Sequence, residues 1–402
     1  MSSSNKPMSY DSTKILLQHL EANQRFKISR HCPSLRVTEK CVPLKIKDLQ
    51  LEGKDHFTVN DHTYKWGIYF KYPEGVPILE THQKSNEKGG VQDEFDKYGV
   101  NKNHVRLTEE RLAELLKEKG DGPWSYSEEQ ARIEALKNRR DDTLPIYQMM
   151  IQLSITSPRE TTIQRFDYTI KLAEFKKKLA DVLFGGRSHP IFVDKMLLKY
   201  SAAYLLRKSL RDTLRFIPRK FRIIEKDLDC WSTFIQMIDK KSLPIEYVSL
   251  LYPSWECWRS SHPVVVTAKH LIIWTYEFDE HWFTDIPKLS NQRIKFYKRD
   301  DEPDGFIRMV KCVAEYWMKN DREIGARFSI PLVYIRENRL IEPLEEIIAS
   351  LNGEQVGESS YVIPTKFNKK IQVSFETDDK SDDPFGQHLR AWRMIRITVL
   401  QA

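Results

Sequence analysis

Three short clusters in this sequence carry residue types that can do chemistry. The acidic run at 300–305 offers carboxylates to a cation, Gly185-Gly186-Arg187 offers amides and a guanidinium to an anion, and His31-Cys32 with Cys41 offers metal ligands. Each cluster departs from the pattern that its chemistry needs. A calcium loop alternates its ligands and ends on a distal Glu, a phosphate loop places its glycines before a helix, and structural zinc takes four ligands. We therefore expect a turn, a helix stop and ordinary thiols.

The motifs of common catalytic sites do not occur in the chain. G-x-x-x-x-G-K-[ST], G-x-G-x-x-G, G-x-S-x-G and H-E-x-x-H are all missing. We predict no catalytic residue, no metal ligand, no cofactor and no enzymatic activity. The five cysteines are an odd number without C-x-x-C spacing, which predicts free thiols in a reducing compartment, the cytoplasm or the nucleus. No run approaches the roughly 18 apolar residues of a membrane helix, so no membrane contact is expected.

Basic side chains concentrate in one segment, 207–222, where Asp212 is the lone acid. The basic residues are Arg207, Lys208, Arg211, Arg215, Arg219, Lys220 and Arg222. We predict a surface patch that attracts acidic partners by charge. Nucleic acid is the less favoured partner, because only Phe216 and Phe221 interleave the charges to stack on bases. A solvated face beside a strand remains the alternative, since the net charge of +7 over 402 residues is mild.

The elements that position these residues divide into four predicted segments. Residues 1–42 are expected to form short helices, with Asp11 at the positive end of the first one. Residues 43–80 alternate apolar and polar side chains, which predicts a small antiparallel meander. Residues 81–143 are rich in charge and predict a helical insertion, with a partner-binding coiled coil as the alternative.

The fourth segment, 144–402, carries short strand-like runs that begin at Ile191, Phe221, Tyr247, Leu271 and Ile294. Helical patterns follow several of them, and a regular strand-plus-helix period is typical of a βα solenoid. We predict a C-terminal region of βα repeats, similar to leucine-rich repeats although L-x-x-L-x-L-x-x-N does not recur. The predicted fold class is α+β or α/β, and a mixed α+β domain with evenly spaced strands is the alternative.

The opening of the chain resembles an F-box, the module that docks a protein on the Skp-type adaptor of a cullin-type ubiquitin ligase. The resemblance rests on a Pro before an acidic residue, on apolar positions at helical spacing, and on Arg25-x-x-Ile28-Ser29-x-x-Cys32. It implies adaptor contacts from Pro7, Tyr10, Ile15, Leu16, Leu20, Ile28, Cys32 and Leu35.

The chain as a whole resembles a nematode-expanded family of uncharacterised F-box-like proteins. The similar segments are 30–36, 39–44, 63–69, 89–99, 151–155 and 316–325. The resemblance implies a substrate-recognition component of the ligase, with a variable C-terminal region for an unknown protein target. Met8 after Pro7 and Leu35 in place of a frequent Trp depart from the F-box pattern. The alternative is therefore an interaction module that has lost its adaptor and uses a basic surface on acidic protein or nucleic acid.

Overall fold

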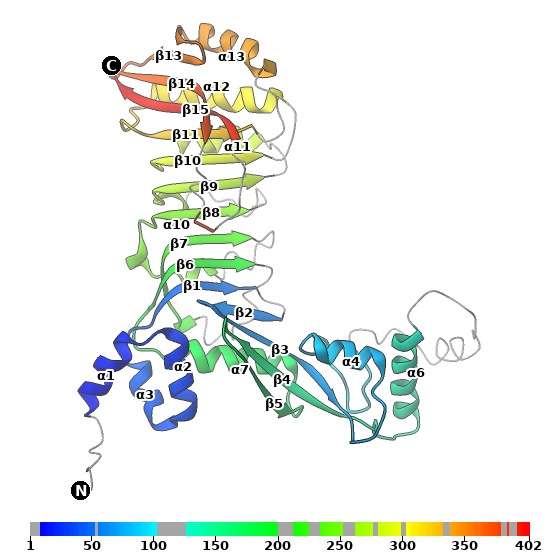
Figure 1. Ribbon diagram of the computed structural model, residues 1–402. Coiled ribbons are helices and arrows are strands. Elements are labelled where there is room, and N and C mark those ends of the chain that lie inside the picture. The colour runs from blue at the N-terminus through cyan, green and yellow to red at the C-terminus, as the bar shows by residue number, and fades with distance from the viewer. Residues whose placement is uncertain are drawn as a thin grey trace.

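The computed structural model describes residues 9–52, 55–102, 126–199, 212–224, 234–251, 262–275, 280–298, 303–332, 338–378, 384–385 and 392–402. The strands of these residues form one open, mixed sheet in the order β12-β13-β14-β15-β11-β10-β9-β8-β7-β6-β1-β2-β3-β4-β5. Figure 1 shows this sheet as a tall column, with the N-terminal helices at one end and the C-terminal strands at the other. The architecture is consistent with the α+β class predicted from the sequence.

One end of the sheet is antiparallel. Its strands are β1 (Lys45–Leu51), β2 (His56–Val59), β3 (His62–Lys71), β4 (Gln148–Thr156) and β5 (Thr161–Asp167). A tight turn joins β2 to β3, where Asn60 adopts a positive φ of 55°. β4 pairs with β3 from Thr63↔Thr156 to Lys71↔Gln148. The predicted meander of 43–80 thus continues into strands that follow the charged insertion and the expected boundary at residue 144.

The middle of the sheet is parallel. It contains β6 (Ile191–Lys199), β7 (Phe216–Ile224), β8 (Tyr247–Leu251), β9 (His270–Thr275), β10 (Arg293–Lys298) and β11 (Arg327–Pro331). β6 also pairs in parallel with β1, which joins this region to the antiparallel end. The five runs predicted as strands therefore lie side by side in chain order. The second of them begins at Phe216, before the predicted start at Phe221.

A recurring apolar pattern explains why these strands stack in register. In each, buried positions follow the order i, i+3, i+5, so that equivalent side chains of neighbouring strands meet on one face. The positions are Ile46, Leu49 and Leu51; Val193, Met196 and Leu198; Pro218, Phe221 and Ile223; Ile245, Val248 and Leu250; Ala268, Leu271 and Ile273. Strands that share one buried stripe cover each other's apolar surface, which favours continued stacking over separate small sheets.

At β10, the first position of this i, i+3, i+5 pattern is a polar residue. Asn291 occupies the first position, before Ile294 and Phe296, and is almost fully buried. Its amide donates two hydrogen bonds of 2.7 Å, to the carbonyls of Val265 and Ala268. A buried amide is tolerated when its donors are satisfied, and here both bonds tie β10 to the turn before β9.

Four antiparallel strands close the far end of the column. β15 (Trp392–Gln401) pairs with β11, and β14 (Lys369–Asp378), β13 (Ser360–Pro364) and β12 (Glu354–Gly357) follow outward. β15 thus pairs with the edge of β11, the last strand of the parallel stack.

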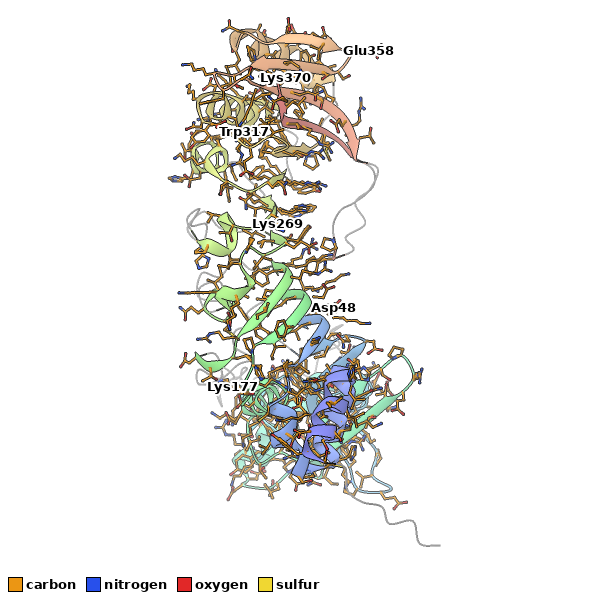
Figure 2. The ribbon with its side chains drawn as sticks, turned by 90° about the vertical axis from the view of Figure 1, so that its left-hand side faces the viewer. Asp48, Lys177, Lys269, Trp317, Glu358 and Lys370 are labelled. Atoms are coloured by element: carbon orange, nitrogen blue, oxygen red, sulfur yellow. The ribbon has the colours of Figure 1, made fainter. Side chains whose placement is uncertain are left out.

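Helices cover the buried face of the stack. They are α7 (Leu172–Phe184), α10 (Pro263–Val266), α11 (Glu280–Asp285), α12 (Pro303–Lys319) and α13 (Asn338–Ser350). The apolar stripe of α12 is buried, and Trp317 at its end donates from its indole nitrogen to the Pro287 carbonyl at 3.3 Å. In Figure 2, Trp317 of α12 and Asp48 of β1 lie toward opposite sides of the sheet.

The charged insertion holds two described helices, α4 (Glu80–Glu87) and α6 (Tyr126–Arg140). Both helices agree with the helical insertion predicted for 81–143, and residues 103–125 between them lie outside the described residues. α7 begins at Leu172, after β5 and the turn that follows it. α7 ends at Phe184 with Gly185 as its C-cap, as the helix-stop interpretation of Gly185-Gly186 requires.

Candidate functional site

The N-terminal residues form a small helical module of α1 (Tyr10–His19), α2 (Ala22–His31), the 3-10 turn η1 (Pro33–Leu35) and α3 (Arg36–Lys40). Ser9 caps α1 by accepting from the Ser12 amide at 3.2 Å. The Glu21 carboxylate caps α2 by accepting from the Asn23 amide at 2.7 Å. Both caps satisfy amides that a helix start leaves without partners. The module thus has its own local reasons to fold at these boundaries.

The structure places the predicted adaptor-binding residues unevenly. Tyr10, Ile15 and Leu16 on α1 are 54%, 58% and 44% exposed. Leu20, Ile28 and Leu35 are half-buried, Cys32 is exposed, and Pro7 lies outside the described residues. The apolar surface that the sequence predicts around Leu16 is therefore open, whereas part of the predicted set helps to build the module itself.

Leu17 is the residue that sequence reasoning missed on α1. It is only 1% exposed, and Thr13 one turn earlier is also buried. Residues four apart share one face of a helix, so Thr13 and Leu17 face inward and turn Ile15 and Leu16 outward. On α3, which packs against α1, Val37 is exposed as well. The module thus presents apolar side chains to solvent after its own core is complete.

A buried ionic cluster fixes this module to the rest of the molecule. The Arg25 guanidinium donates to the Glu39 carboxylate at 3.0 Å and to the carbonyls of Pro43, Val42 and Glu39. Arg187, directly after α7, donates to the two carboxylate oxygens of Glu39 at 3.0 and 3.2 Å. Burial lowers the pKa of both arginines, and the charge of Glu39 opposes that shift. One carboxylate therefore joins α2, α3 and the segment after α7.

Two further contacts hold the module in place. The Lys40 ammonium donates to the carbonyls of Val182 and Leu183 at 2.6 and 3.1 Å, at the negative end of the α7 dipole. The Asn23 amide donates to the Val59 carbonyl at 2.9 Å and accepts from the Tyr64 hydroxyl at 2.8 Å. The helical module is thus attached to both the sheet and α7, and α1 is presented in a defined orientation.

The predicted basic patch is divided by the sheet. Arg219 is exposed and pairs with Asp194 and with Glu246, the second at 3.0 Å. Lys220 and Arg215 are half-buried, whereas Arg207, Lys208 and Arg211 lie outside the described residues. Arg222 is only 2% exposed and donates to the Ser249 hydroxyl at 3.2 Å, so its prediction as a surface residue is wrong. Residues outside the segment 207–222 supply the acids that pair with Arg219 and the contacts that bury Arg222. The sequence of the segment alone does not show these contacts.

The same register brings Lys220 of the predicted patch together with basic residues that sequence reasoning missed. A row of directly paired positions crosses the sheet on the face opposite the apolar ladder. The row is Asp48, Lys195, Lys220, Tyr247, His270, Arg293 and Arg327. Arg293 and Arg327 are exposed, and the other cationic members are half-buried. Every member directly precedes the middle residue of the i, i+3, i+5 pattern, which is the sequence signal that predicts this basic row.

Aromatic side chains lie beside the basic row. The rings of Trp274 and Tyr297 stack with centroids 3.9 Å apart. Phe385, from the connection between β14 and β15, lies 6.1 Å from the Tyr247 ring and 4.6 Å below the Arg222 guanidinium. Flat aromatic and guanidinium surfaces are typical of protein-recognition sites. Tyr247, Tyr297 and Arg222 are buried here, and only Trp274 and Phe385 are half-buried, so the basic row itself is the exposed part of this face.

Neither a metal-binding group of side chains nor a membrane-spanning helix occurs in the part of the chain that the structure describes. No group of three or more His, Cys, Asp or Glu side chains in these residues is arranged to hold a metal ion. No helix among them is both long and apolar enough to cross a membrane.

Comparison with known proteins finds a family match over the parallel stack. Residues 171–332 match the family described as a domain of unknown function, DUF3557. The matched segment runs from the residue before α7 to the residue after β11. No curated protein and no solved structure matches the chain. The family match thus covers α7 and the six parallel strands β6 to β11, and leaves the helical module and the C-terminal strands outside it.

Proposed function

We propose that this protein is a non-enzymatic substrate receptor of a cullin-type ubiquitin ligase. In this proposal the module α1–α3 is an F-box that docks a Skp-type adaptor, and the parallel stack binds a protein target. The membership in the nematode-expanded F-box-like family is part of the same proposal, as are the βα-repeat description of the stack and a location in the cytoplasm or nucleus.

The open apolar surface of α1 carries this proposal. Ile15 and Leu16 stay exposed although Leu17 between them and α2 is buried. Burying a Leu or Ile side chain contributes roughly 1.5–3 kcal/mol, so a partner that covers both residues gains appreciable affinity. The ionic cluster of Arg25, Glu39 and Arg187 holds α1 in place, which lowers the ordering cost of binding.

The basic row supports the second half of the proposal and also the second candidate function. Its four lysines and arginines, with His270, face the same side as Tyr247. A surface of this kind attracts an acidic protein and speeds encounter with it. If the module has lost its adaptor, the protein acts as an interaction module that contacts acidic protein or nucleic acid through this row.

Reconstitution distinguishes the two candidates. The purified chain is mixed with a Skp-type adaptor and a cullin, and the assembly is followed by size-exclusion chromatography. Ligase receptor function predicts one peak that contains all three proteins, and its loss with Ile15→Asp/Leu16→Asp. The control Ile324→Asp, at another exposed apolar residue, should assemble like the wild type. A chain that elutes apart from adaptor and cullin contradicts the proposal and favours the interaction module.

A further inference from the structure

We infer that the groove between α2, α7 and the β4–β5 hairpin docks an apolar segment of a partner protein with acidic flanking residues. The groove has a volume of about 900 Å³ and lies on the helix-bearing face of the antiparallel end. It is a second contact surface, because Tyr10, Ile15 and Leu16 do not line it. The inference does not depend on adaptor binding by α1.

The lining of the groove is apolar on three sides. Phe26 of α2 and Leu153 and Ile155 of β4 are buried at its floor. Phe175 of α7 packs with its ring centroid 5.5 Å from that of Phe166 on β5. Phe166 is nevertheless 42% exposed, and Val182 at the end of α7 is 60% exposed. Apolar side chains from a helix, a strand and a sheet floor thus converge on one concavity that a partner side chain can fill.

The rim determines the chemistry of the occupant. Lys27, Arg30, Arg36 and Lys178 surround the groove with positive charge, and two acids, Glu160 and Asp181, oppose them. Glu39 and Lys40 also border the groove, but the first is held by two arginines and the second by α7 carbonyls. The rim therefore has an excess of cations, which complements Asp or Glu side chains on either side of an apolar segment.

Two polar atoms in the lining point to the same occupant. The Ser29 hydroxyl and the Arg30 Nε are buried and have no hydrogen-bond partner within the described residues. Both side chains line the groove, and both groups can donate to a carboxylate or a backbone carbonyl. A buried donor without a partner is costly. Both atoms lie just beneath the surface of the groove, so a shift of the lining side chains is needed before an acceptor of the occupant can remove that cost.

The β4–β5 hairpin also provides an edge. β5 pairs with β4 and is the last strand of the sheet. Thr162, Gln164 and Phe166 of β5 line the groove, and Arg165 borders it as well, whereas Ile163 is not part of its lining. Ile163 is 51% exposed, so it is a matched control for Phe166 on the same strand.

Selection from a phage-displayed library of random short peptides, against the purified full chain, tests this inference. Enriched peptides should share an apolar centre with Asp or Glu on both sides. A synthetic copy of one such peptide, measured by fluorescence anisotropy, should bind the Phe166→Glu/Val182→Glu variant about tenfold more weakly or not at all. Ile163→Glu should bind it like the wild type. Lys27→Glu/Lys178→Glu should weaken binding and reduce its salt dependence.

Each contrary result overturns the inference. These are the absence of enriched peptides, enrichment of basic or purely polar peptides, and equal binding by the Phe166 variant and the wild type. Circular dichroism and thermal unfolding establish that the variants are folded. Sedimentation of the wild type tests a second copy of the chain as the occupant. A dimer that Phe166→Glu abolishes would show that the groove binds another copy and not a partner protein. Ile15→Asp/Leu16→Asp should leave peptide binding unchanged, which separates this site from α1.

Discussion

The antiparallel end of the sheet and its parallel stack are held together by different kinds of buried groups. In the stack, strands repeat one apolar pattern, and helix α12 covers it with Trp317. At the antiparallel end, a carboxylate and two guanidinium groups are buried where α2, α3 and the segment after α7 meet. Apolar ladders tolerate any neighbour of similar size, whereas a charge cluster accepts one arrangement. We therefore expect the apolar stack to contribute mainly stability, and the charge cluster to fix mainly the orientation of α1.

The largest expected effect in the stack comes from Trp317→Ala. Trp317 is buried between α12 and the 3-10 turn at Ile286–Lys288, to which its indole donates. Truncating a buried Trp removes packing and leaves a cavity, which costs about 3–5 kcal/mol. Urea denaturation of both proteins measures the change in the free energy of unfolding. The exposed control Ile324→Ala should change it by less than about 0.5 kcal/mol, and a similar small value for Trp317→Ala would contradict the apolar account of the stack.

Glu39→Gln tests the ionic half of the comparison. Loss of the carboxylate charge leaves two buried arginines without compensation, so we expect a cost of about 3 kcal/mol in unfolding free energy. The exposed residue Glu160 offers the matched control Glu160→Gln. Limited proteolysis should also cleave the α1–α3 module earlier in Glu39→Gln than in the wild type. Equal stability of the two variants would show that the cluster does not fix the module.

A pH titration sharpens the comparison within the antiparallel end. His82 stacks on Phe70 at 3.7 Å and shares a hydrogen bond of 2.9 Å with the Tyr72 hydroxyl. Burial lowers the pKa of His82 from 6.5 to about 4. The unfolded chain therefore binds a proton below pH 6.5 that the folded chain does not bind until about pH 4, and stability falls across this window.

The expected loss that His82 causes is about 3 kcal/mol, since the pKa falls from 6.5 to about 4 and each pKa unit corresponds to about 1.4 kcal/mol. The unfolding free energies of wild type and His82→Gln are compared at several pH values. The carboxylates titrate in both proteins, so the difference isolates the contribution of His82. The difference between the two proteins should change with falling pH below 6.5, the ordinary pKa of histidine. A constant difference would mean that His82 takes up its proton in the folded state as readily as in the unfolded state.

The smallest expected effect comes from the exposed ion pairs of the stack. Arg219 pairs with Asp194 and Glu246 across three strands, yet all three groups are in contact with solvent. Exposed ion pairs contribute about 0–1 kcal/mol, so Arg219→Ala should cost less than about 1 kcal/mol in unfolding free energy. A loss as large as that of Glu39→Gln would remove the distinction between buried and exposed charge on which the comparison rests.

Local periodicity predicted much of the stack. The strand runs near Ile191, Tyr247, Leu271 and Ile294 carry their own apolar signal, and α12 shows a clear stripe. Because neighbouring strands follow each other in the chain, their order also follows from the sequence. The basic row is predictable from the position before each middle apolar residue, but only once the register is known.

Contacts between distant residues set the limit of that prediction. Arg187 reaches Glu39 across 148 positions, and no local pattern links them. β4 pairs with β3 across the charged insertion, so the meander could not be bounded by composition alone. Arg222 looked like a surface cation because Phe385, which lies against its guanidinium, comes from the distant connection between β14 and β15. On α1, the adjacent residues Ile15, Leu16 and Leu17 are all apolar, and only the packing of Leu17 decides which of them face solvent.

Isothermal titration of the purified full chain with a recombinant Skp-type adaptor tests the central claim most directly. We expect a dissociation constant in the micromolar range or below, because the apolar face of α1 is open and rigidly held. Ile15→Asp/Leu16→Asp should abolish the heat of binding, whereas Phe166→Glu/Val182→Glu should leave it unchanged. Absence of binding by the folded wild type, or equal binding by the α1 variant, would contradict the claim that this module is an adaptor-docking F-box.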